Sequence, residues 1–138
     1  MATPSGETTR QPTPRPEEIT PEARMERRWP QPVQVGALIG LPVLDDDDRT
    51  LGVVRRVMRT PADKIVLIVD HHAWYGLGWL GLGVRPVSVP IEVVAIFGRQ
   101  LASLDMPPAD YAAAPTWAQR QETDIPAGET IRIALTRR

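Results

Sequence analysis

Short apolar runs recur along most of the chain and restrict what it can fold into. From Val35 onward they are separated by turn residues every eight to twelve positions. This spacing is typical of a small all-β barrel or sandwich rather than of a helical protein. We therefore expect an all-β fold, with strands near residues 36–44, 51–59, 65–71, 84–91, 93–98 and 100–104.

The first three predicted strands carry local signals of how they connect. The sequence DDDDR at 45–49 suits a solvated turn, so the first two strands are expected to form a hairpin. In the second strand Val54 and Val57 are three positions apart, which predicts a bulge near Arg55 and Arg56. The third strand is apolar on both faces, which indicates a central strand or one covered on its second face, with another subunit as a conceivable cover.

The later part of the chain alternates strand and helix signals. Pro86 and Pro90 cannot donate ladder hydrogen bonds, so they confine the fourth strand to an edge or a bulge. The sequence PPADYAAAP at 107–115 predicts one or two turns of helix that end at Pro115. The final segment, ETIRIALTRR, alternates apolar and other residues and predicts an amphipathic C-terminal strand.

The N-terminal segment has a different composition from the rest. Seven of the fifteen prolines lie within residues 1–32, and residues 1–18 offer almost nothing to bury, so we expect a disordered tail there. Thr20, Pro21 and Glu22 form a helix-start pattern, which predicts a short helix of at most two turns. The expected organisation is a tail at 1–32, a β domain at 33–117, and a linker with the C-terminal strand at 118–138.

Charge and composition argue against several functional classes. The formal net charge is −1 and is balanced within each segment, which argues against a nucleic-acid binder that depends on a basic patch. The chain has no cysteine, so disulfides and thiolate chemistry are excluded. Its first 25 residues do not resemble a signal peptide, and no window offers 18 apolar residues for a transmembrane segment, so we expect a soluble cytoplasmic protein.

Four short motifs occur in order between residues 35 and 117. They are Gly-x-Pro-Val at 40–43, Leu-Gly-Val-Val at 51–54, Gly-Leu-Gly preceding Val-x-Val-Pro at 87–90, and Leu-Asp-Met at 104–106. By this ordered set the chain resembles the PRC-barrel domain family. Its departures from the family are the N-terminal tail, a longer stretch between the third and fourth strands, and the C-terminal strand.

The resemblance carries expectations about fold and function. It implies a small, strongly bent antiparallel β-barrel of about six strands, with a short helix after the barrel and an extra C-terminal strand. Related barrels occur in the photosynthetic reaction-centre H subunit and in the C-terminal half of a ribosome-maturation factor, and these bind proteins or ribonucleoprotein. The family implies a bacterial interaction module that is not an enzyme, and it supplies no catalytic residues.

The sequence HHAWYGLGWLGLG at 71–83 is the most unusual stretch of the chain. The adjacent histidines point to opposite faces of an extended chain, which argues against a shared metal. Its glycines precede a strand rather than a helix, which argues against a phosphate-binding loop. The large side chains either plug the end of the barrel or form an exposed lip for a second copy or a partner, with a membrane surface as a third alternative: Trp74, Tyr75, Trp79, Leu80 and Leu82.

These observations favour a non-enzymatic protein-interaction or scaffold module that self-associates, as a dimer, and can offer its tails to another protein. Candidate interface residues are those of the lip together with Ile131, Ile133 and Leu135 of the C-terminal strand. The alternative is a ribonucleoprotein-associated RNA-binding domain, with Arg55, Arg56 and Arg59 as candidate contacts. We expect no metal and no cofactor, because the aspartate run lacks the EF-hand spacing and no acid, base and nucleophile cluster in the sequence.

Overall fold

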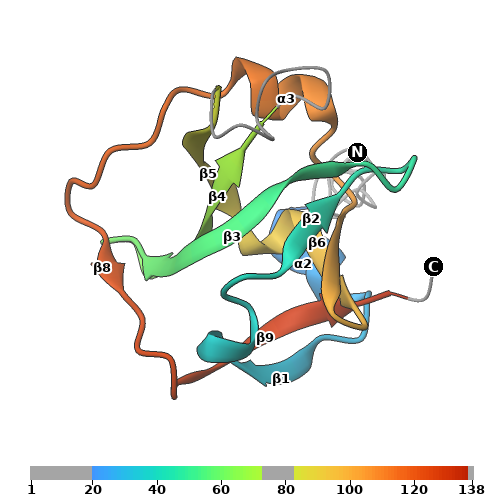
Figure 1. Ribbon diagram of the computed structural model, residues 1–138. Coiled ribbons are helices and arrows are strands. Elements are labelled where there is room, and N and C mark those ends of the chain that lie inside the picture. The colour runs from blue at the N-terminus through green and yellow to red at the C-terminus, as the bar shows by residue number, and fades with distance from the viewer. Residues whose placement is uncertain (1–19, 73–82, 137–138) are drawn as a thin grey trace, which may run out of the picture.

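The computed structural model describes residues 20–72 and 83–136 (Figure 1). The helices in this part of the chain are α2 (Pro21–Glu26) and α3 (Pro108–Ala113), with the 3-10 turns η2 (Val35–Ala37) and η4 (Ile91–Val93). The strands are β1 (Gln31–Gln34), β2 (Pro42–Leu44), β3 (Thr50–Arg59), β4 (Ile65–His71), β5 (Arg85–Pro90), β6 (Val94–Phe97), β7 (Gln100–Ser103), β8 (Thr123–Asp124) and β9 (Thr130–Leu135). The all-β class predicted from the sequence is therefore confirmed for the described residues.

Both short helices form where the sequence predicts them. The Thr20 hydroxyl accepts a hydrogen bond from Ala23 N–H at 3.1 Å, and Pro21 occupies the first turn of α2, where a missing N–H costs nothing. Helix α3 likewise begins with proline at Pro108 and ends before Pro115. Its aromatic residue, Tyr111, is fully buried and anchors the helix to the sheet.

The first three predicted strands form an antiparallel meander with the expected irregularities. Strand β2 pairs with β3 through the aspartate-rich turn, where Asp45 Oδ1 accepts hydrogen bonds from Asp47 N–H and Arg49 N–H at 2.8 and 2.9 Å. The pairing of β3 with β4 shifts register between Val54 and Arg56, which confirms the predicted bulge. Strand β4 lies between β3 and β5, so its predicted central position is also confirmed.

The sheet differs from the six-stranded antiparallel barrel that we expected. In the described residues nine strands form one mixed sheet in the order β1-β9-β6-β7-β2-β3-β4-β5, with β8 beside β3, and the sheet is not closed. Two of its pairings, β2 with β7 and β6 with β9, are parallel. The C-terminal strand β9 is thus an interior strand, paired within the chain to both β1 and β6.

Prolines occur in the strands at both ends of the open sheet. Strand β5 contains Pro86 and Pro90, and it lies at one end of the sheet, as the sequence predicted. Strand β1 lies at the other end, and there Val35 N–H donates to Glu129 O at 2.9 Å. In an antiparallel pair every second residue points its backbone N–H and C=O toward the partner strand, so Val33 faces β9 as Val35 does. The backbone of Pro32 then faces outward, where proline provides no N–H donor to the free edge.

The predicted strand at 36–44 is wrong over its first half. Residues Val35–Ala37 form the 3-10 turn η2, and extended structure begins only at Pro42. Val35 and Leu38 are both fully buried, and their spacing of three matches the 3-10 repeat rather than the strand repeat. Gly40 then adopts a φ of 93°, which reverses the chain before β2.

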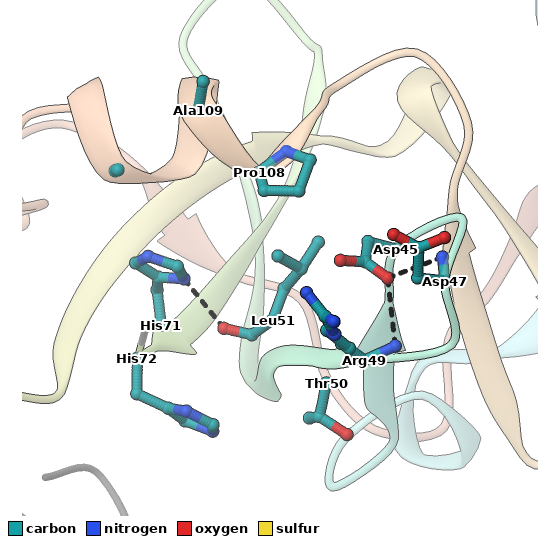
Figure 2. A pocket seen from close by; sticks show the side chains of 10 residues that line it. Asp45, Asp47, Arg49, Thr50, Leu51, His71, His72, Pro108 and Ala109 are labelled. Atoms are coloured by element: carbon teal, nitrogen blue, oxygen red, sulfur yellow. Dashed lines mark hydrogen bonds between the residues drawn. The ribbon is translucent and has the colours of Figure 1, made fainter. Parts of the chain in front are cut away.

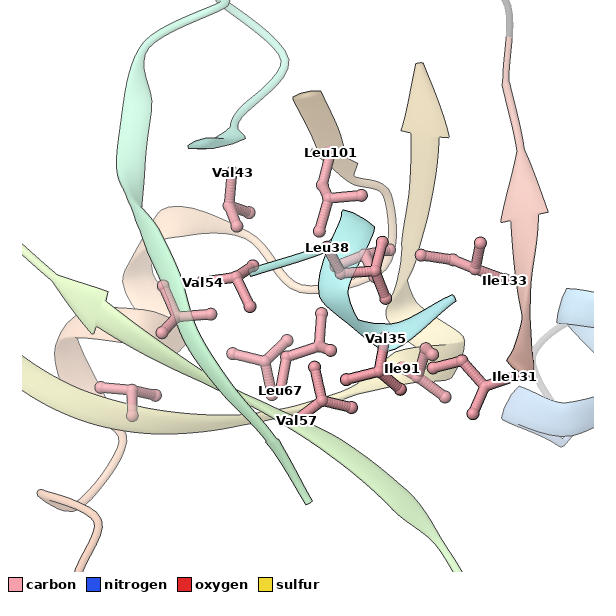
Figure 3. Close-up of a cluster of buried hydrophobic side chains, with 14 of the residues drawn as sticks. Val35, Leu38, Val43, Val54, Val57, Leu67, Ile91, Leu101, Ile131 and Ile133 are labelled. Atoms are coloured by element: carbon pink, nitrogen blue, oxygen red, sulfur yellow. The ribbon is translucent and has the colours of Figure 1, made fainter. Parts of the chain in front are cut away.

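A single cluster of buried side chains lies inside the curved sheet (Figure 3). Leu67 and Val69 of β4 meet Val35 and Leu38 of the η2 region and Ile133 of β9 in this cluster. Residues from near both ends of the described chain therefore share one core. Burial of this apolar surface is the main favourable contribution to folding.

Residues 114–125, which we call the belt, run from α3 to β8 (Figure 1). Trp117 N–H donates to Pro86 O at 2.8 Å, and Ile125 N–H donates to Val57 O at 3.0 Å, so the belt crosses from β5 to β3. Arg56 of β3 and Ser88 of β5 are the register partners of Ile68 of β4, so these three side chains lie on the same face of the sheet. On that face the Arg56 guanidinium lies over the ring of Trp117, at 5.4 Å from its centroid. The second face of β4 is thus covered by the chain's own belt.

Candidate functional site

The lip predicted from the sequence cannot be placed. Trp74, Tyr75, Trp79, Leu80 and Leu82 lie outside the described residues. All three alternatives for these residues, namely a plug of the barrel, a contact surface for a second copy or partner, and a membrane-surface lip, stay predictions.

The candidate interface residues of the C-terminal strand separate into two environments. Ile131 and Ile133 belong to the hydrophobic core, because β9 lies between β1 and β6. Leu135, near the end of the strand, keeps 38% of its surface exposed. Of these three residues, only Leu135 therefore offers an apolar side chain to a partner.

The three candidate RNA-contacting arginines are each beside a carboxylate. Arg56 Nε donates to Asp124 Oδ1 at 3.0 Å, and this bond holds the pKa of Asp124 below its ordinary value. Arg59 forms ion pairs with Glu129 at 2.7 Å and with Asp63 at 3.2 Å. Arg55 lies 3.6 Å from Asp70. These acidic neighbours neutralise the charge that phosphate binding would need.

An exposed tryptophan stands out at the junction of α2 and β1. Trp29 exposes 78% of its surface, the highest value among the exposed large hydrophobic side chains of the described residues. It lines a surface hollow with Arg27, Arg28, Leu135 and Thr136. We call these five residues the Trp29 surface.

The backbone holds Trp29 in an unfavourable conformation. Its φ is 53°, in the left-handed region that costs an L-residue about 1–2 kcal/mol. The chain is fixed on one side by Arg28, whose guanidinium donates to both Asp105 carboxylate oxygens at 2.7 and 3.0 Å. Arg28 O also accepts a hydrogen bond from Leu135 N–H at 2.9 Å. The fold thus presents Trp29 outward at a cost in backbone energy.

The sequence analysis did not single out Trp29. The available signal was a tryptophan in the polar segment ERRWPQP, where no apolar neighbour provides a core position for it. A large aromatic residue in such a setting is a candidate for an interface, since exposed tryptophans are enriched at binding hot spots.

A second concave feature is a pocket of about 290 Å³ between the aspartate-rich turn, the ends of β3 and β4, and helix α3 (Figure 2). One wall is polar and contains Asp45, Asp47 and Arg49. The opposite wall is apolar and consists of α3 residues. Thr50 and Leu51 at the start of β3, with His71 and His72 at and just beyond the end of β4, complete the lining.

His71 is the most buried titratable side chain of this pocket, with 6% of its surface exposed. Its Nδ1 lies 2.8 Å from Leu51 O, and because a carbonyl only accepts, Nδ1 carries the proton. Burial lowers the pKa of His71, and the charges of Arg85 and His72 act in the same direction, whereas the bond to Leu51 raises it. In the neutral form of the ring the lone pair is therefore on Nε2.

Within residues 20–72 and 83–136, no three His, Cys, Asp or Glu side chains are grouped so as to hold a metal ion. Nor does this part of the chain contain a helix with the length and apolar character needed to cross a membrane. The chain matches no protein-family model and no curated protein.

Proposed function

We propose that this chain is a non-enzymatic protein-interaction module of the PRC-barrel type that self-associates through the Trp29 surface. The ordered motifs at 40–43, 51–54, 87–90 and 104–106 support the family assignment. The single curved sheet around one core supports a compact module of this kind. The open edges at β1 and β5 are then where this module departs from a closed barrel.

The observation that carries the proposal is the exposure of Trp29 on a strained backbone. A buried tryptophan is explained by packing, but a tryptophan 78% exposed gains nothing from the core of its own chain. Backbone strain of this kind persists at sites where it has a functional use. Tryptophan also contributes more than most residues to protein interfaces, because it buries a large area with little loss of side-chain entropy.

A second copy of the chain fits this surface by its chemistry. In a two-fold symmetric dimer each contact is made twice, so the surface must be complementary to itself. Arg27 lies two residues before Trp29 and is exposed, and its side chain forms no ion pair or hydrogen bond with the described residues. The Arg27 guanidinium of one copy can stack on the Trp29 ring of the other, while the two Leu135 side chains supply apolar contact.

The edges of the sheet direct association toward such side-chain contacts. A free strand edge would favour pairing of backbones, which extends into larger aggregates. Pro32 on β1 and the two prolines of β5 remove donors from both edges. Side chains next to the β1 edge, with Trp29 the most exposed, are therefore the better contact surface.

Light scattering coupled to size exclusion tests the proposal. The wild-type chain is expected to have twice the mass of one chain, and Trp29→Gly is expected to be a folded monomer, since glycine tolerates the φ of 53°. The matched control is Ile39→Ser, which removes another exposed large side chain and should leave the dimer intact. A wild-type monomer at all concentrations, or a dimer that persists in Trp29→Gly, would show the proposal to be wrong.

A further inference from the structure

A third hollow, of about 290 Å³, lies at the outer edge of β5, where the belt turns away from α3 (Figure 1). It is lined by Ser88 of β5 and by belt residues between 114 and 120, and its surface is mostly apolar. We call it the belt hollow. It shares no lining residue with the Trp29 surface, so its properties do not depend on self-association.

Two N–H groups at the belt hollow lack an acceptor within the described chain. Trp117 Nε1 is the only buried side-chain nitrogen or oxygen of the described residues without a hydrogen-bond partner. On β5, Pro86 O accepts from the backbone N–H of Trp117 at 2.8 Å, so Pro86 faces away from β4. Every second residue of a strand faces the same way, so the backbone N–H of Ser88 also points outward, and no acceptor of the belt reaches it. A ligand rich in acceptors would pair both donors and remove the desolvation cost of the indole.

The chain contains a segment with this chemistry. The sequence Gln-Pro-Thr-Pro-Arg-Pro at 11–16, which precedes the described residues, has a proline at every second position. Each proline keeps its carbonyl acceptor but has no N–H donor, and its ring packs well on an aromatic side chain. Sequences of this kind favour the extended polyproline II conformation in water, so binding in that form costs little conformational entropy.

The described chain begins close to the belt hollow. Glu22, in the first turn of α2, forms an ion pair with Lys64, which directly precedes β4. The start of β4 pairs with the end of β5 at Pro90, and Ser88 lies two residues, or about 7 Å, further along β5. Residues 17–19 connect the proline-rich segment to α2 and span up to about 10 Å. This connection is long enough for the segment to lie along β5.

We propose that residues 11–16 dock in the belt hollow of their own chain and run along the outer edge of β5. Carbonyl groups of the segment accept hydrogen bonds from Ser88 N–H and from the indole of Trp117, which is only partly buried and can turn its N–H toward the hollow. The proline rings pack on the apolar lining. The docked segment covers the open edge of the sheet and occupies the hollow against proline-rich peptides of other proteins.

Charges at the belt hollow are complementary to those of the segment. Arg120 N–H donates to Glu122 Oε1 at 2.9 Å, and this bond is the main cause of the lowered pKa of Glu122. The Trp117 indole contributes to the lowering of this pKa, but it does not complete a hydrogen bond with the carboxylate. Glu122 is therefore charged at neutral pH and can pair with Arg15, while the Arg120 guanidinium can pair with Glu17.

The first test measures hydrogen exchange at the Trp117 indole by NMR of the ¹⁵N-labelled full chain. It compares wild type with a proline variant that carries Pro12→Ala, Pro14→Ala and Pro16→Ala. We expect the indole to exchange about fivefold faster in the proline variant, because the hydrogen bond supplied by the docked segment is lost. Pro4→Ala, outside the segment, is the matched control and should exchange as wild type does. Dilution should not change these rates, since the segment belongs to the same chain.

The second test measures affinity for a synthetic peptide of residues 9–18. We expect saturable shifts at the Trp117 indole and the Ser88 amide of the proline variant, and about tenfold weaker binding to wild type, whose own segment competes at high effective concentration. Within the proline variant, Trp117→Phe should weaken peptide binding about fivefold and Glu122→Gln about threefold. Asp63→Asn, which changes a remote exposed carboxylate, is the control and should leave the affinity unchanged.

Several results would overturn the inference. These are equal indole exchange in wild type and the proline variant, protection of the indole that disappears on dilution, the absence of saturable peptide binding to the proline variant, or equal peptide affinity of that variant and wild type. Unchanged affinity in both Trp117→Phe and Glu122→Gln would also overturn it. If Trp117→Phe does not fold, the other comparisons decide the question, because the proline substitutions precede α2.

Discussion

Gly52 shows how a single position can determine the spacing of two strands. An added Cβ at this position would lie 2.3 Å from Asp70 O and 2.7 Å from Val69 Cγ1, so β3 and β4 approach more closely than a side chain permits. We predict that Gly52→Ala lowers the free energy of unfolding by about 1–3 kcal/mol in urea denaturation. Gly128→Ala is the control, since nothing lies within 4 Å of its added Cβ. Equal stability of the two variants would contradict the close packing.

Tyr111 makes the stability of the fold depend on pH in the alkaline range. Burial raises the pKa of its phenol to about 12, although the hydrogen bond with Ser103 acts in the opposite direction. The folded state holds the phenol proton more tightly than the unfolded state does. The stability that the protonated Tyr111 gives to the folded state is therefore complete below pH 10 and is lost as the pH rises toward 12. We predict that Tyr111→Phe has a shallower fall in unfolding free energy between these pH values than wild type. Parallel curves for the two proteins would contradict the burial of this hydroxyl.

At the scale of elements, the belt should open separately from the sheet beneath it. Arg56 holds it through three contacts: the ion pair with Asp124, the stacking on Trp117, and a hydrogen bond that its guanidinium donates to Gln119 Oε1 at 3.3 Å. We predict that Arg56→Lys, which loses the planar fork and the stacking, speeds hydrogen exchange at the amides of Trp117 and Ile125 with little change in overall stability. Arg55→Lys is the matched control, because its side chain is more exposed and its partner lies at 3.6 Å. Equal exchange in both variants would show that the belt is held by other contacts.

Elements were predictable where a local pattern determines them. The strand at 65–71, the bulge at 54–56 and both helices follow from short-range spacing, proline positions and capping. The parallel pairings of β2 with β7 and β6 with β9 were not predictable, because they join segments distant in sequence and leave no local signature. The η2 turn was missed because a spacing of three at Val35 and Leu38 is easily obscured by the apolar run that follows.

The candidate site was less predictable than the fold. Apolar alternation in the C-terminal strand correctly indicated a face to bury, but it could not distinguish the chain's own core from a partner, and Ile131 and Ile133 lie in the core. The arginines of β3 were visible in sequence, whereas their carboxylate partners at 124 and 129 come from about seventy residues away. Exposure of Trp29 depends on the same long-range packing.

For the molecule as a whole, one core depends on both halves of the chain. Residues 118–138 contribute β8 and β9, and β9 is an interior strand of the sheet. We predict that truncation after Trp117 abolishes cooperative thermal unfolding, because it uncovers β1 and β6 and removes Ile131 and Ile133 from the core. Circular dichroism of the truncated chain checks this. A cooperative transition would show that residues up to 117 fold alone, as the sequence-based domain boundary implies.

The central claim is that two copies of the chain meet through Trp29. The most direct measurement is an isotope-filtered NOE experiment on a mixture of ¹³C,¹⁵N-labelled and unlabelled chains. We predict intermolecular cross-peaks from the Trp29 indole to Arg27 and Leu135, which lie on the same surface. A sample without such cross-peaks, at concentrations well above those used for light scattering, would contradict the claim.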